Sequence, residues 1–187
     1  CNIALMRQAQ SVKKGVRTNG GTPREFCTIT VTDGIAMGHE GMKSSLISRE
    51  VIADSAELTV RGHCYDALVG IAGCDKSLPA LMMAMVRLNV PSVFIYGGSI
   101  LPGKYKGKDV TVVDVFEAVG KHSSGKMSAK ELRKLELVAC PTAGACGGQF
   151  TANTMACVSE AIGLALPYSA GTPAPYEERD KYAFASG

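Results

Sequence analysis

Three cysteines stand where a loop meets a helix, so their side chains can point into a shared crevice: Cys1, Cys74 and Cys146. Cys146 lies in the glycine-rich stretch Gly144–Gly148, directly before a helical pattern whose N-terminal amides and dipole would stabilise a thiolate or an anionic cluster. The wide separation of the three lacks the local spacing of a zinc finger or a ferredoxin, so spacing alone names no metal. A small buried hydrophobe is an equally good interpretation of each one.

Three thiolates are one fewer than the four that usually close an iron–sulfur cluster. If a cluster is present, one iron is left open to act as a Lewis acid on a substrate oxygen.

Two aspartates, Asp33 and Asp75, follow neighbouring predicted strands and are hard oxygen donors of the kind that Mg²⁺ prefers. A single loop aspartate is more often a turn or cap residue. Two of them at adjacent strand ends, one flanked by Cys74 and Lys76, favour a metal site. His39 fits either a donor in the same pocket or a structural histidine.

The other four cysteines lie within or at the ends of predicted elements, and we expect them to be small buried hydrophobes: Cys27, Cys64, Cys140 and Cys157. Seven cysteines at irregular spacing, without a signal sequence, indicate a reducing compartment. Because the chain starts at Cys1 without a Met, we interpret it as a segment of a longer protein that could have lost a targeting peptide.

The apolar periodicity predicts alternating strands and helices, and these elements position the candidate residues. Strands are expected at Phe26–Val31, Leu68–Ala72 and Ser92–Tyr96, and helices at Ile3–Val16, Ser44–Arg61, Leu78–Leu88, Thr111–His122, Ser128–Val138 and Thr151–Leu166. The buried stripe of the second helix is expected to be Leu46, Ile47, Val51, Ala53 and Leu58, and Ser128 with Glu131 is expected to form a capping box.

This alternation predicts an α/β fold with a mostly parallel sheet covered on both faces. Ligands of such sheets bind beyond the carboxyl ends of the strands, which brings the loops 32–39, 73–77 and 97–99 together. We expect one domain over residues 1–166, followed at 167–187 by a linker or the start of a further segment.

The composition argues against two other classes of protein. The net charge of +3 is spread along the chain and there is no Trp, which argues against nucleic-acid binding. No apolar stretch approaches the ~20 residues of a membrane span.

Four stretches resemble the dihydroxy-acid dehydratase family, and they occur in order over nearly the whole chain. They are TDGIAMGHEGMKSSLISREVIADS from Thr32, GCDKSLPA from Gly73, VPSVFIYGGSI from Val90 and CPTAGACGGQFTANTM from Cys140. The resemblance implies a three-layer α/β/α fold for this N-terminal part, in agreement with the pattern of elements.

By the same resemblance, Cys1, Cys74 and Cys146 match the three cluster cysteines, and Asp33 and Asp75 match Mg²⁺ ligands. Lys76 matches a lysine that is carbamylated to give a further oxygen ligand, which removes its repulsion of a cation. The sequence around Cys146 looks more like members that hold a 2Fe–2S cluster than like those with a 4Fe–4S cluster.

The implied reaction is removal of water from a 2,3-dihydroxy carboxylic acid to give a 2-keto acid, a step of isoleucine and valine biosynthesis. The family's proton-abstracting serine and one more Mg²⁺ ligand lie in a C-terminal domain outside this chain, so the resemblance implies that the segment alone is inactive. It also implies a homodimer, in the cytoplasm or, after loss of a transit peptide, in an organelle matrix or stroma. The alternatives are a sugar-acid (aldonate) dehydratase of the same superfamily and a non-catalytic iron–sulfur or zinc-binding module.

Overall fold

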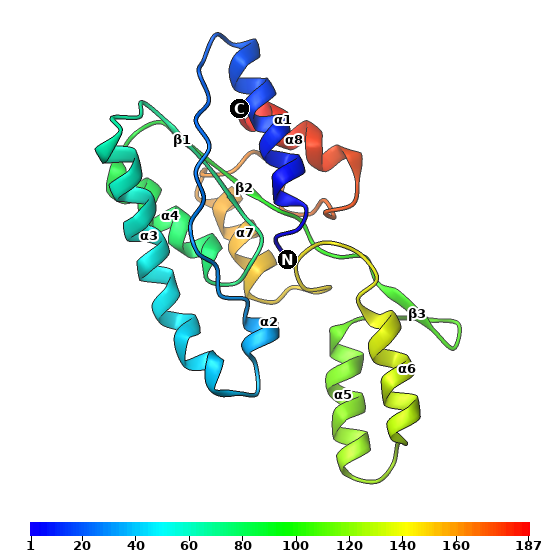
Figure 1. Ribbon diagram of the computed structural model, residues 1–187. Helices are drawn as coiled ribbons and strands as arrows, with labels where there is room; N and C mark the ends of the chain where they lie inside the picture. The colour runs from blue at the N-terminus through cyan, green and yellow to red at the C-terminus, as the bar shows by residue number, and fades with distance from the viewer.

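The central sheet pairs β1 (Leu68–Ala72) with β2 (Ser92–Tyr96) in parallel, in a computed structural model that describes residues 1–187 (Figure 1). Both strands have the bounds that their apolar runs predict. Ala72 lies opposite Tyr96, so the two strands end together and the loops that follow them share one edge of the sheet.

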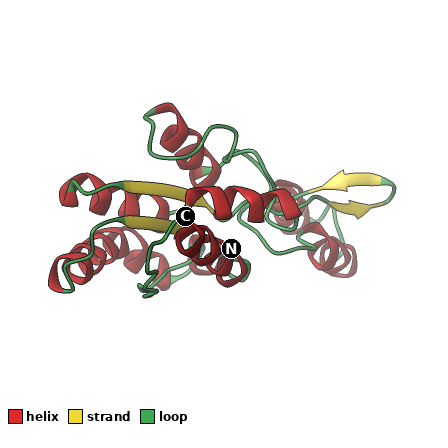
Figure 2. Ribbon diagram, turned by 90° about the horizontal axis from the view of Figure 1, so that it is seen from above, coloured by secondary structure: helices red, strands yellow, loops and turns green.

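Helices pack against both faces of this sheet (Figure 2). On one face, Leu68, Ala72 and Phe94 join the main core. On the other, Ile95 packs with Val12 and Ala183. The first face is covered by α4 (Ser77–Leu88) and α7 (Thr151–Ala161), with α3 (Ser45–Gly62) packed on α4, and the second by α1 (Leu5–Thr18) and α8 (Glu177–Ser186). The α/β class is therefore confirmed, although the parallel sheet is small.

The strand predicted at Phe26–Val31 is wrong, because these residues pair with no strand. Their β-branched side chains favour extended backbone, but a strand also needs a partner. The glycine-rich stretch after them contains two short helices, α2 (Asp33–Ala36) and the 3₁₀ helix η1 (Glu40–Ser44).

Helix α7 ends earlier than predicted, because Gly163 takes the left-handed conformation at φ +79°. The chain then runs alongside β2, where Phe94 donates its amide to the carbonyl of Leu164 at 2.7 Å and bridges to Ala165. This short bridge extends the sheet beyond its two strands.

The buried face of α3 differs from the predicted one. Of the expected stripe only Ala53 is buried, whereas Ile47 is 66% and Leu58 is 69% exposed. The face that packs against α4 is made mostly of small residues, namely Ser45, Ser48, Ile52, Ala53, Ala56 and Val60. Ser48 Oγ donates to the Ser45 carbonyl at 2.5 Å, so its buried hydroxyl is satisfied within the helix.

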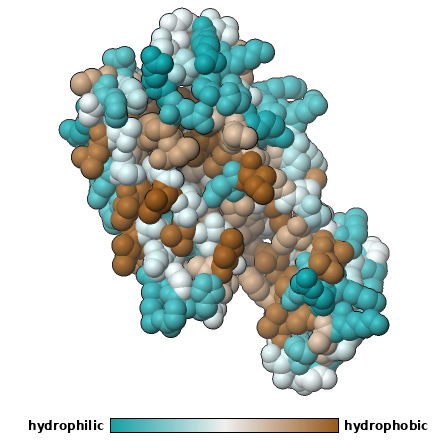
Figure 3. All heavy atoms as spheres, in the orientation of Figure 1, coloured by the Kyte–Doolittle hydropathy of each residue, from teal (hydrophilic) through white to brown (hydrophobic).

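A second unit projects from the main body (Figure 1) and has its own small core of Val110, Ala118, Leu135 and Ala139. It consists of the antiparallel pair β3 (Gly103–Tyr105) and β4 (Lys108–Val110), with α5 (Val112–Ser123) and α6 (Ala129–Ala139). Ser128 caps α6 by accepting the Glu131 amide, while the reciprocal capping box forms at α5, between Thr111 and Asp114. Hydrophobic side chains also gather on the surface over α3 and over this unit (Figure 3).

The stretch predicted as a linker or the start of a further segment contains α8, which lies beside α1 (Figure 1). Arg179 of α8 is fully buried and donates to the Tyr96 carbonyl at 2.8 Å. None of the helices in the structure combines the length and the apolarity that a membrane crossing requires.

Gly15 marks the closest approach of α1 and α8, because a Cβ there would overlap the carbonyl oxygen of Phe184. We expect Gly15→Ala to lower the free energy of unfolding by about 1–3 kcal/mol, as overpacking does. The matched control is Gly120→Ala inside α5, where a Cβ meets nothing within 4 Å and should add about 0.5–1 kcal/mol of stability. Chemical denaturation measures both, and equal effects of the two changes would contradict the α1–α8 contact.

Candidate metal centre

The sequence-predicted residues Asp33, Asp75 and Lys76 come together at the carboxyl edge of the sheet. Lys76 Nζ lies 2.7 Å from Asp33 Oδ2 and 2.5 Å from Asp75 Oδ2. The side chains of Lys76, Asp33 and Asp75 are 16%, 13% and 17% exposed, so both ion pairs are well shielded from water. An ammonium group therefore occupies the point between two carboxylates, where their charges favour a cation.

The two aspartates reach this point from different elements. Asp33 is the first residue of α2 and Asp75 lies in the turn between β1 and α4, with Lys76 at the N-cap of α4. Ser77 closes that turn, because its Oγ donates to the Cys74 carbonyl at 2.9 Å and accepts the Cys74 amide at 3.3 Å. The backbone around Asp75 is therefore fixed independently of the ion pairs.

The environments of the two carboxyls shift their pKa values in opposite directions. Burial acts to raise the pKa of Asp33, but hydrogen bonds from Asp75, Lys76 and Ser45 outweigh burial and lower it. Burial raises the pKa of Asp75, and the adjacent carboxyl of Asp33 raises it further. One proton is thus held more readily by Asp75 than by Asp33.

Ser45, which the sequence analysis did not single out, donates its hydroxyl to Asp33 Oδ1. It is buried at the first turn of α3 and so joins that helix to the two aspartates. The sequence could have pointed to Ser45 only through its position in the stretch from Thr32 that resembles the family.

Of the three candidate cluster cysteines, Cys74 is buried and Cys1 and Cys146 are partly buried. A Cβ on Gly73 would lie 2.5 Å from the carbonyl oxygen of Cys1, so the glycine lets the Cys1 backbone approach the turn that carries Cys74. Burial raises the pKa of the Cys146 thiol, and the nearby Cys74 raises it further. All three residues thus lie around the carboxyl end of β1.

The prediction for the other four cysteines is wrong, since Cys27, Cys64, Cys140 and Cys157 are all exposed. Cys157 lies on an exposed side of α7, and the other three lie outside the helices and strands. His39 is held by its own loop: its Nδ1 accepts the Gly41 amide at 3.0 Å, and its Nε2 lies 2.8 Å from the Ile35 carbonyl.

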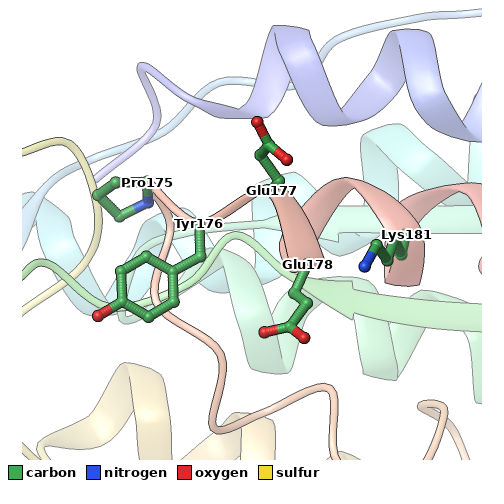
Figure 4. Close-up of a pocket in the computed structure, with 5 residues that line it drawn as sticks. All are labelled: Pro175, Tyr176, Glu177, Glu178 and Lys181. Carbon is green, nitrogen blue, oxygen red and sulfur yellow. The ribbon is translucent and has the colours of Figure 1, made fainter.

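A surface hollow at the start of α8 contains none of these residues (Figure 4). Its lining includes Glu177 and Glu178, whose side chains point away from each other, and Lys181. Nowhere in the structure do three or more His, Cys, Asp or Glu side chains lie together as a ready-made set of metal ligands. The candidate site is therefore the edge of the sheet, where the two carboxylates contact the lysine.

The comparisons with known proteins agree with one another. The family model described as dihydroxy-acid/6-phosphogluconate dehydratase N-terminal matches residues 1–187. Over its whole length the chain is 96% identical to a protein of Pelagibacter ubique (strain HTCC1062) named dihydroxy-acid dehydratase, covering 33% of that protein. Proteins of the same name from Parvibaculum lavamentivorans and Sulfurisphaera tokodaii are 83% and 56% identical to the whole chain, which covers 32% and 33% of them.

The chain thus spans about a third of the length of the curated relatives it matches. Since the family model covers every residue, the chain belongs to the dihydroxy-acid/6-phosphogluconate dehydratase N-terminal family.

Proposed function

We propose that this chain is the metal-holding part of a hydro-lyase that removes water from 2,3-dihydroxy carboxylic acids to give 2-keto acids. The observation that carries the proposal is the Lys76 ammonium between the carboxylates of Asp33 and Asp75, with Cys74 in the same turn. The names of the relatives agree with this reaction class. Branched-chain amino-acid biosynthesis is the corresponding pathway.

The thiols around the carboxyl end of β1 are donors of the type that an iron–sulfur cluster takes. Cys1, Cys74 and Cys146 would hold it, since thiolates are the usual ligands of such clusters. Burial and the nearby Cys74 raise the pKa of the Cys146 thiol, and a cationic iron would favour its thiolate. When bound, a three-cysteine cluster supplies a Lewis acid that favours departure of a hydroxyl group.

The carboxylates of Asp33 and Asp75 fit Mg²⁺, a hard cation that takes oxygen ligands. Ser45 orients Asp33 by its hydrogen bond, so the oxygen facing Lys76 remains fixed. Lys76 would contribute an oxygen only as a carbamate, since an ammonium competes with the metal for both carboxylates.

The proposal also covers the architecture, oligomeric state and catalytic base of the complete protein. There we expect a three-layer α/β/α arrangement for this part, a homodimer, and the proton-abstracting base on a C-terminal domain. A cytoplasmic location, or an organelle matrix, would suit thiol ligands that need a reducing compartment.

The cysteine assignment is tested by single serine substitutions in the full-length protein. We expect Cys74→Ser or Cys146→Ser to abolish iron binding and the visible absorption of the cluster. Cys157→Ser is the control: as an exposed thiol it should keep the cluster and change stability by no more than about 0.5 kcal/mol. Iron analysis and absorption spectra decide, and loss of the cluster in Cys157→Ser with retention in Cys146→Ser would reverse the assignment.

The aspartate assignment is tested by Asp33→Asn and Asp75→Asn, which keep shape but remove charge. Turnover should fall by roughly a hundredfold or more while the cluster spectrum stays intact, because losing a group that only supports a metal ligand already costs about 10–100-fold. Asp66→Asn, at an exposed aspartate before β1, should leave turnover unchanged. Activity near wild type in either of the first two variants would remove that residue from the site.

The rate at which Lys76 forms a carbamate should depend on pH. Burial disfavours the ammonium, but hydrogen bonds and charges of Asp33 and Asp75 outweigh burial and raise the pKa of Lys76. Only the neutral amine reacts with CO₂, so the rate of carbamylation at fixed dissolved CO₂ should rise roughly tenfold per pH unit below that pKa.

Carbon-13 NMR with labelled bicarbonate would follow this rate, and Lys76→Arg should show neither the signal nor activity. A fully active Lys76→Arg protein would exclude the carbamate.

A further inference from the structure

The hydroxyl of Tyr96 is a buried group without a hydrogen-bond partner in the protein. The residue is 1% exposed, and its ring belongs to the main core. Buried tyrosines usually place the hydroxyl against a partner, because an unsatisfied donor loses its bond to water and gains nothing in return. If the ring served only to fill the core, a phenylalanine would do so without that cost.

The position of Tyr96 connects this hydroxyl with the candidate cluster residues. Tyr96 ends β2 directly opposite Ala72, two residues before Cys74. Burial raises the pKa of Tyr96, and the nearby thiols of Cys146, Cys157 and Cys74 raise it further. The ring of Tyr96 therefore lies at the end of the sheet where the turn with Cys74 begins, and it belongs to the same core cluster as Ala145, the neighbour of Cys146.

Arg179 lies on the ring of the same tyrosine, with its guanidinium carbon 5.8 Å from the ring centroid. It is fully buried, and its hydrogen bonds go to the carbonyls of Tyr96 and Thr172 and not to a carboxylate. A buried cation on an aromatic ring withdraws electron density and makes the hydroxyl a stronger donor. It also places positive charge beside a centre that would be anionic.

We propose that the Tyr96 hydroxyl donates a hydrogen bond to a sulfur of the iron–sulfur cluster held by Cys74 and Cys146, and that Arg179 holds and polarises this donor. The inference rests on the proposed function, since it requires the cluster. Hydrogen bonds to cluster sulfurs stabilise the reduced, more negative state and so raise the reduction potential. Tyr96 is thus a residue that tunes and protects the cluster, without contact to substrate being required.

The test is Tyr96→Phe in the full-length protein loaded with its cluster. We expect the midpoint reduction potential to become more negative, and the cluster to bleach in air roughly tenfold faster, because a hydrogen bond to a charged acceptor is lost. Tyr168→Phe is the matched control, since that tyrosine is 82% exposed, and it should leave both quantities unchanged.

A second measurement separates a donor to the cluster from a residue that only fills the core. Without the cluster, Tyr96→Phe should melt at the same temperature as wild type or higher, because it removes an unsatisfied buried hydroxyl. With the cluster, the variant should melt lower than wild type. A purely structural tyrosine would give the same sign of change in both states.

The outcomes also distinguish the two proposals. A wild-type protein that binds no iron–sulfur cluster would end the proposed function, and this inference with it. A wild-type protein that holds the cluster, beside a Tyr96→Phe variant with unchanged potential, bleaching rate and melting difference, would overturn this inference and leave the proposed function standing.

Discussion

The Lys76 ammonium between the carboxylates of Asp33 and Asp75 joins parts of the chain that no sheet hydrogen bond connects. Asp33 follows a segment that pairs with no strand, and its side chain is tied to the sheet edge by Lys76 and to α3 by Ser45. Because the three charged groups are shielded from water, removing the Lys76 ammonium would leave two neighbouring carboxylates without their cation. A divalent cation in place of the ammonium would preserve this constraint, since it too would bind both carboxylates. The same arrangement can therefore be structural without a metal and functional with one.

The fold was predictable where a local pattern determined the structure. Leu68–Ala72 and Ser92–Tyr96 are short apolar runs that fit a sheet covered on both faces, and their bounds match the prediction. Phe26–Val31 has a similar composition but lacks a partner strand, which composition does not encode. In α3 the apolar periodicity indicated the wrong face, because small side chains let α3 and α4 approach closely while the larger ones stay outside. Hydrophobicity is thus a poor guide to burial in a helix that packs through serine and alanine.

The candidate site was predictable for a different reason. The rule that ligands bind at the carboxyl ends of parallel strands brought Asp33 and Asp75 together, although Asp33 arrives from α2 and not from a strand. Ser45 and Tyr96 were not found, because serine in a helix and tyrosine at a strand end have ordinary structural roles. Only the geometry separates them from such residues: Ser45 is bonded to Asp33, and the Tyr96 hydroxyl is buried with no partner. The exposure of four cysteines was equally invisible to sequence, since a free cysteine is commonly buried.

The C-terminal stretch shows how a distant part of the chain can set conditions at the site. Arg179 of α8 is buried against the last residue of β2, where it binds the Tyr96 carbonyl and covers the Tyr96 ring. Burial lowers the pKa of Arg179 to about 10, so the guanidinium remains charged at neutral pH. Keeping such a charge in the core costs free energy, which a neutral side chain would avoid. An anionic centre beyond Tyr96 would offset part of this cost. The packing of α8 on α1 thus keeps a buried positive charge at the carboxyl end of β2.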